Sequence, residues 1–442
     1  MALAKVNLDD KYDLAQDRIY VTGSQAVIRM AMIQHAMDAA RGLNTAGYVT
    51  GYRGSPLGNL DQTLARAGKF LKERNIVFQP GLNEDLAATA LWGAQQAELR
   101  GDGRYDGVFG IWYGKGPGVD RSGDVFRHAN HAGTSPNGGV LALMGDDHTC
   151  ESSTSAHQSE FAFVDAMMPI LNPANVQEII DYGLYGLAMS RFAGVWVGLK
   201  CVKDNIEQTA VIDGRVGRIA PIIPADLEMP PGGLNIRIND APLAKEARLH
   251  DYKRPAVLAF ARANKLDRII LSGGQKPRIG IITTGKSYQD VTEALDLLGI
   301  DEVRAADLGI RLYKVAMTYP LEPDGVMAFG EGLDLIMVVE EKRALIEVQI
   351  KEYLYNAVTR PPIVGKHDEN GEWLFPAKGA LEPVQIALAL ANSIVERVDA
   401  PDISARIAEL EAADRHARAS QAVMERIPYF CAGCPQIGRA HV

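Results

Sequence analysis

The sequence predicts an α/β protein in which parallel sheets are covered by helices. Three observations carry this expectation: helix and strand signals alternate over residues 1–220, a Pro-rich stretch interrupts them over residues 221–275, and the alternation resumes over residues 276–395. Alternating units of this kind usually build a parallel sheet with helices on its faces. A chain of 442 residues is also too long for one ordinary domain. We therefore expect two α/β domains, the second smaller, joined by a linker.

Helix signals in the first domain follow turn or cap residues. Ser24 is the expected N-cap of the first helix and Gly42 its end. Asn83 is expected to cap a later helix, and between the two an apolar face predicts one more helix over residues 60–71. Buried strands are expected where apolar runs lie between helices, at residues 46–52, 108–113, 139–144 and 193–202.

The second domain repeats the pattern on a smaller scale. Strands are expected at residues 279–283 and 335–339, and helices at residues 289–298 and 343–355. The linker should hold one helix near residues 255–264. Residues 403–424 are rich in Ala, Glu and Arg, which predicts a helix there.

Composition and charge exclude several classes of protein. The net charge is −9 and the pI is about 5.6, which argues against a nucleic-acid partner or an anionic membrane surface. No apolar run is long enough to span a bilayer, and residues 1–10 lack the apolar core of a signal peptide. We expect a cytoplasmic protein with no nucleic-acid or membrane partner.

The four cysteines fall into two groups. Cys150 and Cys201 stand alone, and in a reducing compartment we expect both as thiols. Cys431 and Cys434 form a C-x-x-C pair, whose spacing suits a metal, a cluster or redox chemistry. A single pair leaves these alternatives open.

The densest polar cluster covers residues 113–160. It opens with a Gly-rich turn at residues 114–118, directly after an expected strand, and such turns lie at the carboxyl edge of a parallel sheet, where open α/β proteins bind ligands. Plain turn geometry also explains each glycine by itself. The turn is not a P-loop, because no Gly-Lys-Ser/Thr follows at the required spacing. A metal site is the weaker alternative to a structural or substrate-binding loop; its candidate ligands are Asp146, Asp147, His148, His157 and Glu160.

Glu84 is a second candidate functional residue. It lies at the expected start of a helix, directly after Asn83. An acid in the first helical turn interacts favourably with the helix dipole, and Asp85 satisfies that role equally well. From spacing alone, the structural role is favoured.

Taken together, these segments resemble the large fused indolepyruvate ferredoxin oxidoreductases of aerobic bacteria. The likeness extends over residues 18–435, and its motifs are specific as a series. They are GYRGSP at 51–56, GLNEDLA at 81–87, YGKGPG at 113–118, the loop at 146–160, WVGLK at 196–200, VVEEK at 338–342 and CAGCP at 431–435.

The resemblance implies a thiamine-diphosphate enzyme. Residues 1–220 would be its pyrimidine-binding domain, residues 221–275 a linker, and residues 276–395 a transketolase-C-terminal-like domain. Residues 396–436 would lead into a truncated diphosphate-binding domain. Family members oxidatively decarboxylate arylpyruvates, transfer the acyl group to coenzyme A and pass electrons through 4Fe-4S clusters to ferredoxin or another acceptor. Mg²⁺ would be bound in the full-length protein, which we expect to be a homodimer.

The resemblance gives Glu84 a chemical role. A buried carboxylate that is hydrogen-bonded to the aminopyrimidine ring of thiamine favours the imino tautomer, which deprotonates the thiazolium carbon. In the family motif this position falls on Glu84, so we interpret Glu84 as catalytic.

Further site residues follow from the same motifs. The resemblance assigns cofactor binding to Gly54, Ser55, Pro56, Lys115 and Gly116. It assigns substrate binding to Arg53, whose guanidinium suits a carboxylate, and to Ser152, Ser153 and Gln158. Surface solvation for Arg53 and a purely structural role for the loop residues are the alternatives. Cys431 and Cys434 would begin a cluster or cofactor motif.

Two further expectations concern the chain as a whole. We interpret residues 437–442 as a sequencing-adapter artefact, because IGRAHV matches one reading frame of a common adapter. The chain would then be a fragment, inactive alone, that binds thiamine diphosphate weakly or not at all. The competing hypothesis is a non-catalytic α/β binding or assembly module.

Overall fold

The fold consists of two compact α/β units, which are described separately. The computed structural model describes residues 6–420 except residues 55, 152, 154 and 359. Of these residues, the first unit contains 6–146, 157–266 and 317–320, and the second contains 147–156, 267–316 and 321–420. None of the described helices is long and apolar enough to cross a membrane.

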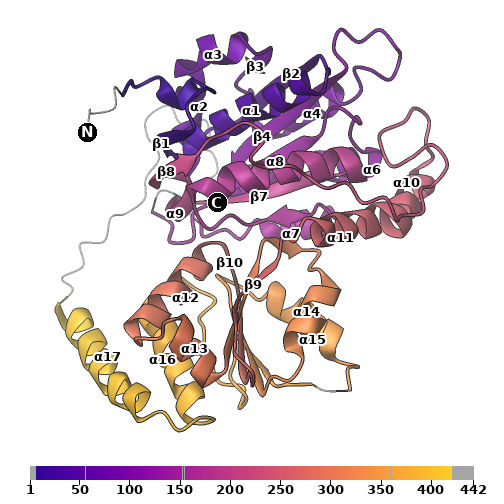
Figure 1. Cartoon of the computed structure of the whole chain (residues 1–442). Helices are drawn as coiled ribbons and strands as arrows, with labels where there is room; N and C mark the ends of the chain where they lie inside the picture. Colours follow the sequence, from indigo (N-terminus) through magenta and orange to yellow (C-terminus); the bar gives the residue numbers. More distant parts are fainter. Residues whose placement is uncertain (1–5, 55, 152, 154, 359, 421–442) are drawn as a thin grey trace. The chain divides into compact units, whose positions relative to one another are not determined.

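A seven-stranded sheet forms the centre of the first unit (Figure 1). Six of its strands are parallel, and the edge strand β12 is antiparallel to β6. In spatial order the strands are β12 (Met317–Tyr319), β6 (Ile170–Leu171), β7 (Trp196–Val202), β5 (Val140–Asp146), β4 (Gly107–Lys115), β2 (Thr45–Gly51) and β3 (Ile76–Phe78). The expected parallel, helix-covered sheet is therefore confirmed.

Side chains that alternate along β5 show that helices cover both faces of this sheet. Ala142 belongs to an apolar cluster with Leu91 and Phe126 of α4 (Glu84–Ala94) and α6 (Gly123–Ala132). Leu141 points the other way, and its side chain lies close to Gly186 of α8 (Val176–Ala193). Helix α1 (Gly23–Ala40) packs against α8 and β2. Because successive strand residues face opposite sides, α4 and α6 cover one face and α8 the other.

The remaining elements of the first unit are short. Near the N-terminus, β1 (Arg18–Thr22) pairs with β8 (Thr209–Asp213) in a separate antiparallel sheet. The other short elements are η1 (Asp10–Tyr12), α2 (Leu60–Arg66), α3 (Gly68–Lys72), α5 (Gly116–Arg121), α7 (Glu160–Asp165) and α9 (Lys203–Ile206). The helix expected over residues 60–71 is thus two short helices.

Helix caps explain where several elements begin and end. The Asn83 side chain accepts a hydrogen bond from the Leu86 amide at 2.9 Å, so the expected cap of α4 is confirmed. The expected cap Ser24 is wrong. Thr22 caps α1 instead, because its hydroxyl and the Gln25 side chain form a reciprocal capping box.

The strand expected from residue 193 begins later than predicted. Helix α8 continues through Ala193 and ends at Gly194, which adopts the left-handed conformation with φ 64°. A Cβ at Gly194 would lie 2.1 Å from the Leu234 carbonyl oxygen, so both its conformation and its surroundings favour glycine. Strand β7 starts at Trp196, once the chain has reversed.

The expected linker is more structured than its Pro-rich sequence predicts. It contains α10 (Pro242–Arg248), the π-helical turn η2 (Leu249–Lys253) and α11 (Arg254–Ala263), which includes the expected helix. The segment also holds β9 (Arg268–Ser272), which pairs with a strand of the second unit. The second sheet therefore begins before residue 276.

The second unit is built on a five-stranded sheet (Figure 1). Four strands are parallel and β9 is antiparallel to β11. The spatial order is β14 (Ile363–Val364), β13 (Leu335–Val339), β10 (Ile279–Thr284), β11 (Ile310–Val315) and β9. The two strands expected at residues 279–283 and 335–339 are confirmed.

Helices also cover both faces of the second sheet. Ile281 of β10 joins an apolar cluster with α12 (Gly285–Leu297) and α16 (Pro383–Val395), while its neighbour Ile282 joins one with α14 (Pro323–Gly330) and α15 (Ile346–Leu354). Figure 1 shows α12, α13 and α16 on one side of this sheet and α14 and α15 on the other. The set is completed by α13 (Glu302–Leu308) and α17 (Pro401–Ser420).

One strand of the first sheet comes from the part of the chain that was predicted to belong to the second domain. Strand β12 lies within the range expected for the second domain, yet it pairs with β6 of the first sheet. Its three residues carry no pattern that identifies a partner sheet, so the pairing is decided by tertiary structure.

A buried lysine joins two helix ends in the first unit. Lys253 is fully buried, and its Nζ donates to the Gly194 carbonyl oxygen at 2.8 Å, with the Asn130 oxygen at 3.4 Å. These carbonyls lie at the C-terminal ends of α8 and α6, where positive charge is favoured. Burial nevertheless lowers the pKa of Lys253 from 10.5 to about 7, with nearby Arg248 acting in the same direction.

Lys253 should make the stability of the protein depend on pH. Between these two pKa values the unfolded chain keeps a proton that the folded chain has released, so the unfolding free energy rises with pH in that window. We expect Lys253→Met to remove a slope of about 1 kcal/mol per pH unit. Urea denaturation at pH 7 to 9 measures it, with exposed Lys72→Met as the control. Equal slopes in both variants would contradict the assignment.

Candidate functional site

The candidate site lies at the carboxyl edge of the seven-stranded sheet. Strands β2, β4 and β5 end there at Gly51, Lys115 and Asp146. The loops after β2 and β3 are tied to this edge, because Tyr52 N donates to the Tyr113 oxygen at 3.0 Å and Gly81 N donates to the Gly51 oxygen at 2.8 Å. The expected convergence of the Gly-rich turns at one edge is therefore present.

Glycines allow side chains to approach the backbone closely at this edge. A Cβ at Gly54 would lie 2.7 Å from Lys115 Cδ, and a Cβ at Gly116 would lie 2.2 Å from His157 Cγ. At Gly118 it would lie 2.6 Å from Glu84 Cγ. Real Cβ atoms do not approach other atoms this closely, so each glycine leaves the space that a neighbouring side chain fills.

Glu84 is buried at the first residue of α4. Only 3% of Glu84 is exposed, and its carboxylate lies against Gly118 of α5. Its own carbonyl oxygen accepts a hydrogen bond from Trp112 Nε1 at 3.0 Å, which fixes the start of the helix on β4. Glu84 therefore points into the polar cluster rather than into bulk solvent.

His157 occupies the other side of α5. Its imidazole lies against Gly116, and its Nε2 is 2.8 Å from Asp120 Oδ2. The short helix α5 is thus flanked by two titratable side chains, Glu84 and His157. Asp85 makes an exposed ion pair with Arg121 of the same helix, at 2.9 Å.

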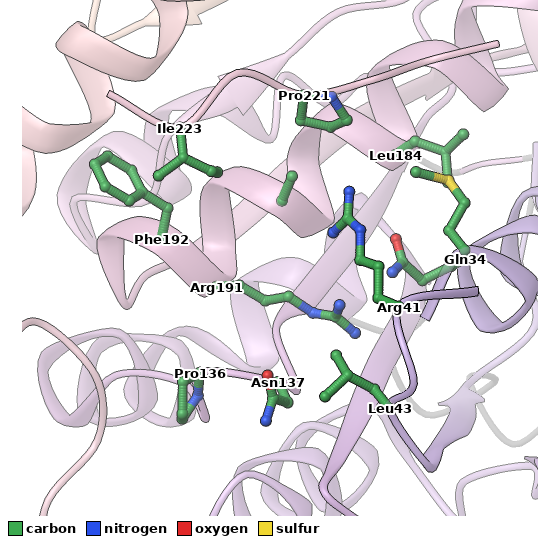
Figure 2. Close-up of a pocket in the computed structure, with 12 residues that line it drawn as sticks. Gln34, Arg41, Leu43, Pro136, Asn137, Leu184, Arg191, Phe192, Pro221 and Ile223 are labelled. Carbon is green, nitrogen blue, oxygen red and sulfur yellow. The ribbon is translucent and has the colours of Figure 1, made fainter. Parts of the chain in front are cut away.

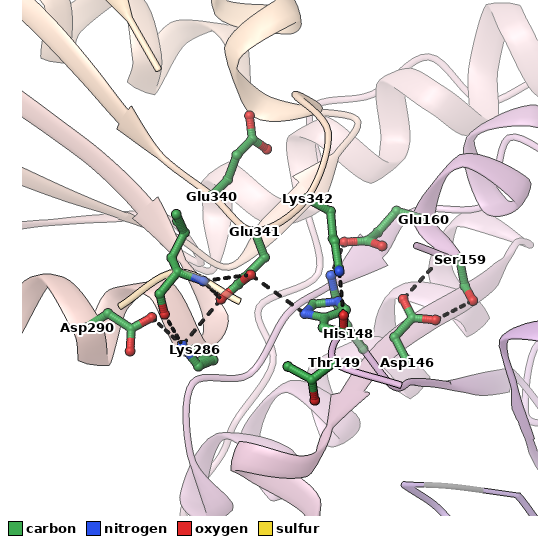
Figure 3. A network of polar contacts seen from close by, with 12 residues as sticks. Asp146, His148, Thr149, Ser159, Glu160, Lys286, Asp290, Glu340, Glu341 and Lys342 are labelled. Atoms are coloured by element: carbon green, nitrogen blue, oxygen red, sulfur yellow. Dashed lines mark hydrogen bonds and ion pairs between the residues drawn. The ribbon is translucent and has the colours of Figure 1, made fainter. Parts of the chain in front are cut away.

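A buried charge network lies beneath the ends of β5 and β7. Glu160 pairs with Lys200, and both are almost fully buried. Burial raises the pKa of Glu160 and nearby Asp146 adds to the rise, while Lys200 opposes it. Figure 3 shows Ser159 bonded to Asp146, with its amide at 2.9 Å and its hydroxyl at 2.6 Å from the two carboxylate oxygens. This network holds the loop end at residues 157–160 against the sheet.

Arg53 lies on the exposed turn after β2. Its charge acts on a neighbouring pair in which Tyr113 donates to Asp61 Oδ1 at 2.5 Å. Burial raises the pKa of Asp61, and both the Tyr113 hydrogen bond and Arg53 oppose that rise. An exposed guanidinium at this edge is accessible to an anion.

The other predicted site residues are distributed as follows. Gly54, Pro56, Lys115 and Gly116 lie at this edge, with Pro56 against Gly145, and Gln158 is half-buried beside His157. Ser153 is buried in residues 147–156, which pack with the second unit. Ser55, Ser152, Cys431 and Cys434 lie outside the described residues.

The five candidate metal ligands do not form one site. Asp146, His157 and Glu160 belong to the first unit, whereas Asp147 and His148 pack with the second. Within the part of the chain that is described, no group of three or more His, Cys, Asp or Glu side chains could hold a metal ion.

His148 belongs to a polar network of the second unit, also drawn in Figure 3. Its Nδ1 is 3.9 Å from Glu341 Oε2, and the other carboxylate oxygen of Glu341 is 3.2 Å from Lys286 Nζ. Glu341 belongs to the VVEEK motif that the sequence singled out. The motif thus anchors residues 147–156 to the second sheet, because Lys342 Nζ also donates to the His148 oxygen.

Both free cysteines in the described chain agree with the expected thiols. Cys150 and Cys201 form no disulfide. Burial raises the pKa of the Cys201 thiol, and nearby Asp146 adds to the rise. A buried thiol with a raised pKa is unreactive.

Two functional features escaped the sequence interpretation. Asp120, the partner of His157, lies in a turn of helix that the sequence did not predict, 37 residues earlier in the chain. The partner of Glu160 is Lys200, at the end of a buried strand. A lysine inside the apolar run WVGLKCV was the one available signal, since a buried lysine requires a partner.

Fold comparison defines the class of protein. The chain superposes on a solved 2-oxoglutarate:ferredoxin oxidoreductase from Magnetococcus marinus with a TM-score of 0.59 and 15% identity, covering 86% of this chain and 66% of that one. The two α/β units therefore have the fold of a 2-oxoacid:ferredoxin oxidoreductase.

Sequence comparison gives a more specific likeness. Residues 269–417 match the model described as "Indolepyruvate oxidoreductase domain". Curated indolepyruvate oxidoreductase subunits IorA from Methanothermobacter marburgensis and Pyrococcus abyssi are 24% and 23% identical over 97% and 96% of this chain. The chain is thus similar to the indolepyruvate oxidoreductases, as the motifs predicted, and spans 61% and 59% of the length of these relatives.

The close contact between Glu84 and Gly118 can be tested by adding one methyl group. Gly118→Ala should displace the buried carboxylate and lower the unfolding free energy by about 1–3 kcal/mol. Gly123→Ala is the matched control, because a Cβ there meets nothing within 4 Å. The control should change the unfolding free energy by less than about 1 kcal/mol, and we expect this change to be an increase. Equal denaturation midpoints for the two variants would show that Glu84 is not held against Gly118.

Proposed function

We propose that this chain is the part of a 2-oxoacid oxidoreductase that holds the aminopyrimidine ring of thiamine diphosphate. The observation that carries the proposal is the buried Glu84 carboxylate against Gly118, at the carboxyl edge of a parallel sheet. Ligands of open α/β proteins bind at this edge. The fold of the chain and its match to the indolepyruvate oxidoreductase domain support the assignment.

The residues at the edge fit the ring. Glu84 offers a carboxylate that is shielded from water, and Gly118 lets this carboxylate lie directly against the backbone of α5. Asn83 and Trp112 hold the first turn of α4, so the carboxylate needs little rearrangement to accept a hydrogen bond. Gly54, Pro56 and Lys115 would complete this wall, with Ser55 beside them in the sequence.

The proposed decarboxylation depends on a proton held between Glu84 and the pyrimidine ring. When bound, thiamine diphosphate supplies the electron sink for cleavage of the bond between the carboxylate and the 2-oxo carbon. Glu84 would accept a hydrogen bond from a ring nitrogen of the pyrimidine, and its burial would keep that proton from exchanging with water. Arg53, exposed on the turn after β2, would bind the substrate carboxylate. Ser152, Ser153 and Gln158 are further candidates for substrate contact.

The finer identity of the reaction is part of the proposal. The relatives named as indolepyruvate oxidoreductase subunits support an arylpyruvate substrate. The structural relative was solved with 2-oxoglutarate, coenzyme A and succinyl-CoA, which supports coenzyme A as acyl acceptor, and its name supports ferredoxin as electron acceptor. Mg²⁺, a 4Fe-4S cluster at or beyond Cys431 and Cys434, and a homodimeric assembly complete the proposed full-length enzyme in the cytoplasm.

Replacing the acid by its amide tests the proposal in the full-length protein. Glu84→Gln should reduce arylpyruvate-dependent dye reduction, measured with thiamine diphosphate, Mg²⁺ and coenzyme A, by about 10²–10⁴-fold, because the amide cannot hold the ring proton in the same way. Asp85→Asn is the matched control. It removes a neighbouring carboxylate that, within the described part of the chain, contacts Arg121 in an exposed ion pair, so turnover should be nearly unchanged.

Stability and turnover must be read together. Urea denaturation of both variants establishes that the fold is intact. Undiminished turnover in a folded Glu84→Gln variant would refute the catalytic assignment. It would favour the alternative, a non-catalytic binding or assembly module.

A further inference from the structure

A cavity of about 340 Å³ lies at the opposite, amino edge of the seven-stranded sheet (Figure 2). Leu43, Asn137 and Phe192 line it, and they precede strands β2, β5 and β7 by a few residues. Glu84 and the Gly-rich turns follow the strands instead. This cavity, called here the amino-edge cavity, is therefore separate from the site described above, and all its lining residues belong to the first unit.

The charged residues that line the amino-edge cavity are both arginines. Arg41 follows the end of α1, and Arg191 lies in the last turn of α8. Figure 2 shows their side chains directed toward the same space, with the amides of Gln34 and Asn137 nearby. No acidic residue belongs to the lining. Because Arg191 is ion-paired with buried Asp38, Arg41 supplies the charge that would favour an anion in this cavity.

Arg191 is held in place before any ligand arrives. Its two terminal nitrogens donate to the Asp38 carboxylate at 2.6 and 2.8 Å, and its Nε donates to the Gly138 oxygen at 2.8 Å. Asp38 is fully buried and also accepts from Gln34 Nε2 and Thr45 Oγ1. A guanidinium has five N–H donors, so two remain after these three bonds. The fixed fork lowers the entropy lost when an anion binds.

Arg41 provides the more available charge. Its side chain is exposed, and no ion pair of Arg41 is found among the described residues. Its position just beyond α1 places positive charge at a helix C-terminus, which is favourable without any ligand. Arg191 also lies at a helix C-terminus and has Asp38 as its partner, so Arg41 is the arginine whose charge is available to a ligand.

The rest of the lining is apolar. Leu184 and Ala188 of α8 line it, together with Pro221 and Ile223 of the connection. The volume falls at the lower end of the range for small-molecule sites, in which an apolar wall with few polar groups is usual. We propose that the amino-edge cavity binds a small organic carboxylate whose apolar body packs on Leu184 and Ile223 while its carboxylate lies between Arg41 and Arg191.

The proposal can be tested on this chain by calorimetry with phenylacetate as the probe. Saturable binding is expected, and Arg41→Gln should weaken it at least about tenfold. Exposed Arg100→Gln, outside the cavity, is the matched control and should bind like the unchanged chain. Uncharged phenylacetamide should bind the unchanged chain more weakly, and Arg41→Gln should not alter its affinity.

A filled cavity tests the location independently of charge. Ala188→Phe should abolish binding of phenylacetate, and the smaller change Ala188→Leu should weaken it if the larger variant fails to fold, as judged by urea denaturation. The proposal is overturned if the unchanged chain shows no saturation up to about 10 mM phenylacetate. It is also overturned if Arg41→Gln and Arg100→Gln bind alike. None of these outcomes depends on thiamine diphosphate or on the activity of the full-length enzyme.

Discussion

The arrangement of the candidate site depends on close contact between side chains and a backbone that carries none. Gly54, Gly116 and Gly118 each lie where a Cβ would overlap a neighbouring side chain. Those neighbours include Glu84 and His157, so the two titratable groups are fixed on either side of one short helix. A carboxylate so placed loses most of its contact with water and keeps a defined direction. Because of this constraint, the Glu84 carboxylate at the start of α4 is held in one place, as its proposed role in proton transfer requires.

Each buried charged side chain discussed for the first unit has a polar partner, and three different arrangements provide one. Glu160 is paired with Lys200, and Asp38 accepts both arms of Arg191. Among the described residues Lys253 forms no ion pair with a carboxylate; it donates to carbonyls at two helix ends, and burial lowers its pKa. Each of these arrangements connects elements that are distant in the sequence, so the buried charged side chains help to specify which segments pack together. At the amino edge Arg191 keeps its pair with Asp38, and Arg41 faces the same cavity.

Much of the fold could be predicted, because local patterns report local structure. Apolar runs identified β2, β4, β5, β10 and β13, and Asn83 identified the start of α4. Errors arose where two local signals competed: Thr22 and Ser24 are both good caps, and only the reciprocal bonds with Gln25 distinguish them. Strand β12 and the pair His157–Asp120 could not be predicted, since their partners lie far away in the sequence.

The sequence by itself determined the likeness to indolepyruvate oxidoreductases, the two α/β units and the position of Glu84 at a helix start, because motif order, periodicity and capping are properties of neighbouring residues. Tertiary structure alone decided that Glu84 is buried against Gly118, that His157 contacts Asp120 of α5, and that residues 147–156 pack with the second unit. The reason is geometric. Burial and pairing depend on how the ends of separate strands converge, and spacing along the chain carries no information about that distance.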